Sequence, residues 1–142
     1  MAKTTIKQVS LMMRGLDLCM FTTVSGRGIT SSRPMSNNSD VNYDGTSYYF
    51  TNGDTRMIHQ IKKNPHVNLS YINDGLLSKI FVSVSGKARL TKKFDEMSAH
   101  WTPDLELWFK KGLKTPGLVM IEVKAHHIKF WKNNKEGEIT LH

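Results

Sequence analysis

One segment of the sequence joins an apolar strand, a polar turn and a helix start that carries anion-binding groups. It runs from Tyr49 to Ile61, with Thr55 and Arg56 at the expected start of the helix. A helix N-terminus offers free backbone N–H groups and the positive end of a dipole, and a guanidinium adds forked donors. Together these groups can hold a phosphate. The alternative is a helix that Thr55 only caps, with Arg56 in solvent, and the segment taken alone favours that alternative.

A second candidate segment is Arg33-Pro34-Met35-Ser36. Arg33 lies in a predicted strand, where an isolated cation needs a partner. Pro34 cannot donate a hydrogen bond to a neighbouring strand, so this strand is expected at the edge of a sheet, with its backbone open to a ligand. An ordinary edge strand without a ligand is the alternative.

Other catalytic chemistry finds little support in the sequence. His126 and His127 are adjacent, so they point to opposite faces of a strand, and no pair of histidines has metal-ligand spacing. Cys19 is the single cysteine and lies in an apolar run, which predicts an inert buried thiol. No Gly-x-Ser-x-Gly motif is present. We therefore expect no metal site, and we expect any redox chemistry to come from a bound cofactor.

The elements that must position these residues follow from periodicity and turn signals. Helical spacing of Ile6, Val9 and Leu16 predicts an opening helix that ends at Gly15 or just beyond. A second helix is expected from Asp54 or Thr55 to Asn64, where Pro65 ends it. Alternating or β-branched runs predict the first five strands at residues 18–25, 29–35, 48–51, 67–71 and 80–90.

The remainder of the chain is expected to be helical first and then extended. Phe94, Met97 and Trp101 suggest one helix, and Pro103 suggests the start of another that Gly112 can end. Two closing strands are expected at residues 118–123 and 126–131, separated by Lys124-Ala125. Six or seven short strands joined largely by hairpins, with flanking helices, predict an α+β fold built on a small, mainly antiparallel barrel.

Length and composition are those of one globular domain. The chain has 142 residues, of which 39% are hydrophobic and 23% charged, so residues 1–142 are expected to form a single domain. The net charge is +8, but the lysines are scattered pairs without a nucleic-acid-binding motif, and we expect no nucleic-acid partner. The longest apolar runs have four residues and no secretory signal is visible, so a cytoplasmic protein without a membrane segment is expected.

Both candidate segments belong to a set of short motifs whose order and spacing resemble a known family. The motifs are Ser32-Arg33-Pro34-Met35, Tyr49-Phe50-Thr51-Asn52, Thr55-Arg56, Ile61 to Val67, Val84 to Ala88, and Ile128 to Trp131. With them, the chain resembles the pyridoxamine phosphate oxidase-like FMN-binding split-barrel family from Phe21 to Trp131. The stretches His100 to Pro103 and Trp108 to Gly112 make it most similar to the bacterial general stress protein subgroup of that family.

This resemblance implies a split barrel that forms a homodimer, with FMN at the subunit interface and touched by both chains. Carried over by position, Arg33, Thr55 and Arg56 would hold the phosphate, and Trp131 would come from the partner chain. Trp131 has the alternative of closing the core of its own chain, because tryptophan is usually well buried. The residues that would line the ring system are Met35, Ser36, Phe50 and Thr51.

The chain also departs from the oxidase pattern. Met57 replaces a lysine beside the phosphate, which predicts weaker FMN binding that Met57→Lys should restore. Asn38 replaces a lysine, Gly137 and Leu141 fall where the oxidase has arginines, and Phe81 takes the place of an FMN-contacting glutamine. A phosphorylated substrate would then lack most of its counter-charges, so we do not expect pyridoxamine phosphate oxidation.

Three functions follow from the resemblance. The first is a small FMN-dependent oxidoreductase, related to the oxidase and linked to the stress response. The second is a flavin store or sensor without turnover. The third is the same barrel around haem or a deazaflavin, where haem would need His59, His66 or His100 as an axial ligand.

Overall fold

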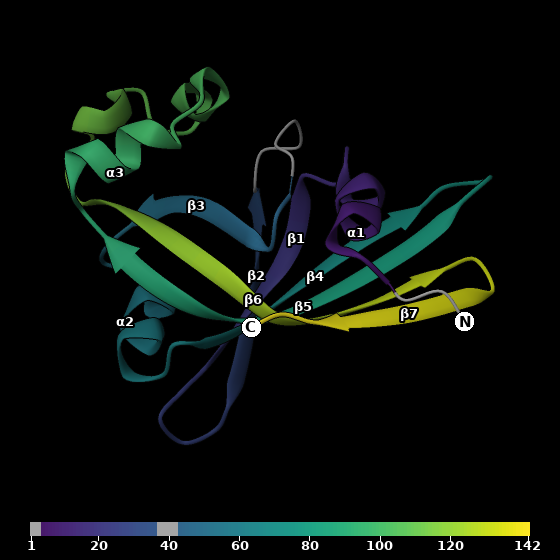
Figure 1. Ribbon diagram of the computed structural model, residues 1–142. Helices are drawn as coiled ribbons and strands as arrows, with labels where there is room; N and C mark the ends of the chain where they lie inside the picture. The colour runs from purple at the N-terminus through teal and green to yellow at the C-terminus, as the bar shows by residue number, and fades with distance from the viewer. Residues whose placement is uncertain (1–3, 37–42) are drawn as a thin grey trace.

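The computed structural model of the chain describes residues 4–36 and 43–142. Its centre is one antiparallel sheet with strand order β2-β1-β4-β5-β6-β3, and β7 pairs with β6 (Figure 1). The α+β architecture with six to seven mainly antiparallel strands is thus confirmed. The strands are β1 (Leu18–Val24), β2 (Thr30–Ser36), β3 (Thr46–Asn52), β4 (His66–Asp74), β5 (Lys79–Thr91), β6 (Leu118–Lys132) and β7 (Lys135–Thr140).

Two helices cover the main core. In α1 (Ile6–Met13), Thr5 and Gln8 form a reciprocal capping box, and Val9 is fully buried. In α2 (Arg56–Lys63), Thr55 is the N-cap residue and Ile58 packs into the core. Both helices lie within two residues of their predicted bounds. No helix in the described part of the chain is long and apolar enough to cross a membrane.

The last part of the sheet differs from the prediction. Residues 118–132 form one continuous strand, β6, and not two. The pairing of β5 with β6 shifts between Ser85, opposite His127, and Gly86, opposite Ala125, so His126 forms a β-bulge directly after Lys124-Ala125, where a break was expected. Gly86 permits the bulge, because a Cβ there would lie 2.5 Å from the carbonyl oxygen of Lys124. Strand β7 was missed, because residues 135–140 are mostly charged and show little apolar alternation.

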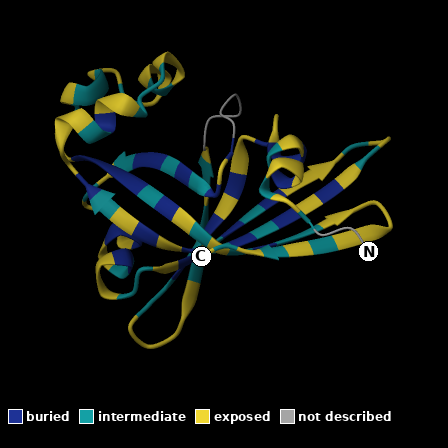
Figure 2. Cartoon of the chain, viewed as in Figure 1, coloured by how far each residue is buried: buried dark blue, intermediate teal, exposed yellow. Residues whose placement is uncertain are grey.

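The helical segment, residues 94–117, also differs from the prediction. Helix α3 (Phe94–Ala99) stops before Trp101, and two short 3-10 helices follow, η1 (Pro103–Leu107) and η2 (Gly112–Lys114). Gly112 therefore begins a helix and does not end one. Met97 is the segment's fully buried side chain, and Figure 2 shows the rest as exposed or intermediate. With so little buried apolar surface, short turns replace the longer helices that periodicity suggested.

The segment joins the sheet through a second, smaller core. Phe50, Leu118 and Met120 on the outer side of the sheet pack with Met97, and Trp101 and Phe109 lie against this cluster. Figure 1 shows the helical segment at one end of the molecule, above β3 and the beginning of β6. It is therefore placed to cover a site on the outer side of the barrel, not in its interior.

The outer face of the sheet carries a row of exposed apolar side chains, which we call the outer row. Ile72 of β4 pairs with Phe81 of β5, which pairs with Trp131 of β6. On β1, Leu18 precedes Cys19, which pairs with Tyr71, the residue before Ile72. These side chains are 63% (Leu18), 58% (Ile72), 39% (Phe81) and 38% (Trp131) exposed. Contiguous exposed apolar surface of this kind is typical of an interface.

Candidate functional site

Two arginines from different elements meet at the edge of the sheet. Arg33 lies on β2, which is an edge strand as predicted, and Arg56 is the first residue of α2. Burial lowers the pKa of Arg33, and the nearby positive charge of Arg56 lowers it further. The like charge of Arg56 thus disfavours the charged form of Arg33, and an anion bound near both groups would offset that effect.

Arg33 is held by one of its two terminal nitrogens. Its Nη1 donates to Thr23 Oγ1 at 2.8 Å, to the Ser31 carbonyl at 3.0 Å and to the Phe21 carbonyl at 3.2 Å. Thr23 is completely buried, and its hydroxyl donates in turn to Oε1 of Gln60 on α2. Thr23 therefore links the strand that carries Arg33 to the helix that begins with Arg56.

The donors that remain are suited to an anion. Within residues 4–36 and 43–142, no carboxylate lies within 4.0 Å of Arg33 or Arg56, and Nε and Nη2 of Arg33 donate to no protein acceptor. Thr55 Oγ1 accepts from the Ile58 N–H at 3.3 Å, which leaves the hydroxyl hydrogen of Thr55 to donate elsewhere. Arg33, Thr55 and Arg56 are thus the donors of a candidate anion-binding cluster, as the two sequence segments suggested.

A cavity of about 600 Å³ lies between the sheet and the helical segment. Ser36 and Phe50, two of the predicted ring-lining residues, are part of its wall. Ser36 follows Arg33 by three residues on β2, a separation of about 10 Å along a strand. Because side chains alternate along a strand, Arg33 and Ser36 point to opposite faces of β2, so a ligand that touches both must pass around this edge of the sheet.

The other predicted ring-lining residues lie elsewhere. Met35 is half-buried and packs against the main core, and Thr51 is half-buried on β3. Neither belongs to the wall of the cavity, and neither do Arg33 or Arg56. The structure thus brings the phosphate-binding candidates together, and it places two of the four ring-lining candidates in one cavity.

Trp131 does not close the core of its own chain. It lies in the outer row, 38% exposed, with Nζ of Lys129 5.3 Å from the centre of its ring. In the register of β6 it pairs with Phe81 on one side and Glu136 on the other. The side chain therefore faces outward, where a second chain can contact it.

The remaining reactive side chains are occupied or inert. Cys19 is buried as predicted, and burial raises the pKa of its thiol to about 11. His59 Nε2 lies 3.2 Å from Asp54 Oδ1, and His66 is exposed, whereas His100 lines the cavity. Across the residues that the structure describes, no three His, Cys, Asp or Glu side chains form a group that could hold a metal ion.

Three of the positions that depart from the oxidase pattern are packed against other side chains of this chain. Met57 is only 4% exposed and belongs to the main core, so its side chain does not reach toward the arginines. A Cβ at Gly137 would lie 2.6 Å from the Phe130 ring, and Leu141 packs against the core. A longer basic side chain at Gly137 therefore has no room. Asn38 lies outside the described residues.

Comparisons with known proteins agree with this fold. A family model described as "Pyridoxamine 5'-phosphate oxidase like" matches residues 4–141. A search of curated proteins found no match.

Three solved structures show the same fold at low sequence identity. A protein related to general stress protein 26 from Clostridium acetobutylicum has a TM-score of 0.80 and 16% identity, over 96% of this chain and 94% of that one. A general stress FMN/FAD binding protein from Xanthomonas citri has a TM-score of 0.74 and 21% identity, over 91% and 89%. A heme binding protein from Mycobacterium smegmatis has a TM-score of 0.76 and 9% identity, over 99% and 60%.

Proposed function

Since the chain belongs to the pyridoxamine 5'-phosphate oxidase-like family, we propose that it binds FMN and acts as a small cytoplasmic oxidoreductase linked to the stress response. The phosphate binds to Arg33, Thr55 and Arg56, and the ring system extends along β2 toward Ser36 and Phe50. The observation that carries this proposal is the pair of neighbouring arginines without a carboxylate partner among the described residues. An FMN phosphate carries nearly two negative charges, which suits two guanidinium groups.

The residues around the site support binding and orientation. Gln60 and Thr23 fix Arg33, so its free donors are preorganised for the phosphate and lose little entropy when FMN binds. Residues 99–108 of the helical segment form one wall of the cavity. A bound flavin would supply the capacity to accept and pass on electrons, which none of these side chains has. The Xanthomonas citri neighbour is described as a general stress FMN/FAD binding protein, which agrees with this proposal.

The phosphate site is tested by titrating FMN into the purified chain and its Arg33→Ala and Arg56→Ala variants. Each variant should bind FMN about ten- to a hundredfold more weakly, the range expected for hydrogen bonds to a charged group. Riboflavin has the ring but no phosphate, so its affinity should change little. Arg27→Ala, in the exposed turn between β1 and β2, is the matched control and should bind FMN normally.

Unchanged FMN affinity in the folded Arg33→Ala and Arg56→Ala variants would overturn this site. Thr55 would then be only a helix cap, and Arg56 an ordinary solvated side chain. Equal losses for FMN and riboflavin would also count against the site, because they would show that the arginines support the ring or the fold and not the phosphate.

Turnover is distinguished from storage by an anaerobic titration of the flavin-loaded protein with NADPH. Rapid bleaching of the flavin absorbance supports the oxidoreductase. A flavin that stays oxidised favours a store or sensor. We expect no formation of pyridoxal phosphate from pyridoxamine phosphate, because Gly137 and Leu141 offer no cation to the substrate phosphate.

Haem is the second candidate, and His100 is the observation that favours it. His100 lines the cavity, whereas His59 is bonded to Asp54 and His66 is exposed at the start of β4. One of the solved structures with this fold is a heme binding protein. Titration with haemin should give a sharp Soret shift that His100→Ala removes if this candidate holds. FMN binding with the phosphate preference described above would favour flavin instead.

We also propose that the chain forms a homodimer through the outer row, which would place Trp131 against the partner. Leu18, Ile72, Phe81 and Trp131 are all exposed apolar side chains on the outer face of the sheet. Homodimer interfaces are more apolar than ordinary protein surface. In the proposed dimer Trp131 would contact the partner chain, as the family resemblance implies.

A further inference from the structure

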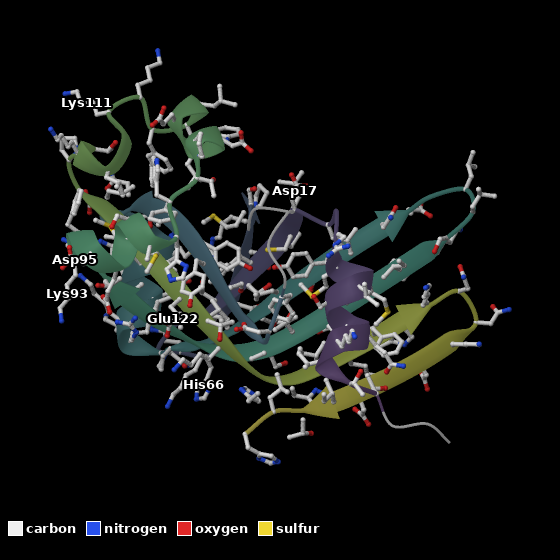
Figure 3. All side chains as sticks on the ribbon, turned by 45° about the horizontal axis from the view of Figure 1, so that its top comes forward. Asp17, His66, Lys93, Asp95, Lys111 and Glu122 are labelled. Atoms are coloured by element: carbon white, nitrogen blue, oxygen red, sulfur yellow. The ribbon has the colours of Figure 1, made fainter. Side chains whose placement is uncertain are left out.

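The cavity between the sheet and the helical segment has an acidic wall. Asp17, which precedes β1, and Asp104, on η1, both line it. In the described part of the chain, neither carboxylate has a lysine, arginine or histidine within 4.0 Å, and no lysine or arginine lines the cavity. Figure 3 shows Asp17 between α1 and the helical segment, with Asp95 on the far side of that segment. In a chain of net charge +8, this acidic wall is a local exception.

The same wall is rich in flat side chains. The rings of Tyr48 and His100 stack with a centroid distance of 3.4 Å and an interplanar angle of 13°. Phe50 and Trp101 meet edge to face at 5.0 Å, and Trp108 is 78% exposed at the rim. Aromatic faces attract cations and stack on planar rings. The cavity is therefore suited to a flat molecule with a positive charge.

Two buried hydroxyls in the wall, those of Tyr43 and Ser47, have no hydrogen-bond partner among the described residues. Tyr43 is 8% exposed and lines the cavity, and its Oη makes no hydrogen bond there. Burial, together with the charge of Asp44, raises the pKa of Tyr43, so the group is a neutral hydroxyl at physiological pH. A buried hydroxyl without a partner costs free energy, and a ligand with a polar substituent would remove that cost.

We propose that this cavity binds a planar aromatic cation, held by Asp17 and Asp104, by the aromatic wall and by a hydrogen bond to Tyr43. This proposal rests on the proposed flavin function, which places the flavin ring system in the same cavity. It adds the class of molecule that the cavity binds beside that ring system. Anionic molecules of the same shape are disfavoured, because the described wall offers them two carboxylates and neither a lysine nor an arginine.

The test uses proflavine, a planar three-ring cation, and anthracene-2-sulfonate, a planar three-ring anion, in calorimetric titrations of the full chain. Proflavine should bind, and the sulfonate should bind at least tenfold more weakly. Asp17→Asn and Asp104→Asn should each weaken proflavine binding about two- to fivefold, as expected for exposed charge pairs, and added salt should weaken it in the unmodified chain. Tyr43→Phe should weaken it without loss of stability.

Two matched controls lie on the same segment. Glu106→Gln, on η1 beside Asp104, and Asp95→Asn, on α3, remove a carboxylate that does not line the cavity, so proflavine affinity should not change. Arg33→Ala should also leave proflavine affinity unchanged in the absence of FMN. If FMN fails to bind but proflavine binds with the expected dependence on Asp17 and Asp104, the flavin function is wrong and the cation site stands.

Three results would overturn the cation site. The first is equal or tighter binding of anthracene-2-sulfonate. The second is proflavine affinity that is the same in Asp17→Asn and Asp104→Asn as in the unmodified chain. The third is a loss of proflavine affinity in Glu106→Gln and Asp95→Asn as large as that in Asp17→Asn and Asp104→Asn. This would show that only the overall negative charge of the segment matters. Binding of spermidine as tight as that of proflavine would overturn the requirement for a planar ring.

Discussion

Thr23 is a residue whose role depends on contacts between distant parts of the chain. Its hydroxyl accepts from Arg33 and donates to Gln60, which joins β2, β1 and α2 at one buried point. Sequence patterns identify Arg33 and Arg56 as candidate anion ligands, because one is an arginine in a predicted strand and the other an arginine at a predicted helix start. They do not identify Thr23 or Gln60. A threonine in a strand is common, and only the packed structure shows that this one is buried beside an arginine.

Thr23→Val should therefore act on both stability and phosphate binding. The change keeps the shape but leaves Gln60 Oε1 without its donor, which should lower the free energy of unfolding by about 1–3 kcal/mol. Because Arg33 also loses a partner, FMN affinity should fall several-fold while riboflavin affinity stays the same. Thr22→Val changes the preceding residue of β1, whose side chain lies on the opposite, outer face of the strand. It is the matched control in both the denaturation and the FMN titration. Loss of stability with unchanged FMN affinity would limit Thr23 to a structural role.

The family resemblance places Met57 beside the phosphate, whereas the structure buries its side chain in the main core. Met57→Lys, which the sequence suggests as a way to strengthen FMN binding, would place an ammonium group in the main core. It should lower the free energy of unfolding by about 3 kcal/mol, and Met57→Leu should cost less than about 1.5 kcal/mol. Burial depresses the pKa of such a lysine, so the unfolded state binds the proton more tightly and the loss should shrink as pH rises toward 10.

Denaturation of both variants at pH 7 and pH 9.5 measures this effect. A stable Met57→Lys protein with tighter FMN binding would show that the side chain at this position reaches the arginines, and that its packing in the core is not fixed.

At the scale of elements, the first five strands and the first two helices could be predicted because local periodicity and turn residues agree with the final packing. The later elements could not. Lys124-Ala125 resembles a break between strands, but the pairing of β6 with β5 carries the chain through it as a bulge. Residues 94–117 have helical spacing but bury little besides Met97, so tertiary contacts do not support long helices there. Both differences come from interactions distant in sequence.

The bulge makes a prediction about Gly86. Gly86→Ala places a Cβ 2.5 Å from the Lys124 carbonyl oxygen, and backbone on both strands must move to relieve the contact. We expect a loss of about 1–3 kcal/mol in the free energy of unfolding, measured by chemical denaturation. Gly26→Ala, in the turn after β1 with no atom within 4 Å of its Cβ position, should change stability by less than about 0.5 kcal/mol. Equal stability of the two variants would show that the bulge does not need a glycine.

At the scale of the whole molecule, the outer row predicts a homodimer. Light scattering at micromolar protein should give twice the chain mass, and Phe81→Glu should give a folded monomer, because it places a charge in the centre of the row. Leu76→Glu is the matched control, since Leu76 is fully exposed at the tip of the β4–β5 hairpin and outside the row. A monomer mass for the unmodified chain with FMN present would contradict the dimer, as would dissociation caused equally by both variants.

The central claim is that Arg33, Thr55 and Arg56 form an anion site for the phosphate of a flavin. The most direct measurement compares the affinities of FMN and riboflavin for the unmodified chain by calorimetric titration at low salt. The account predicts that FMN binds at least tenfold more tightly, about 1.4 kcal/mol, and that this preference disappears in the Arg33→Ala, Arg56→Ala double variant. Equal affinities of the unmodified chain for FMN and riboflavin, or a preference that survives loss of both arginines, would contradict it.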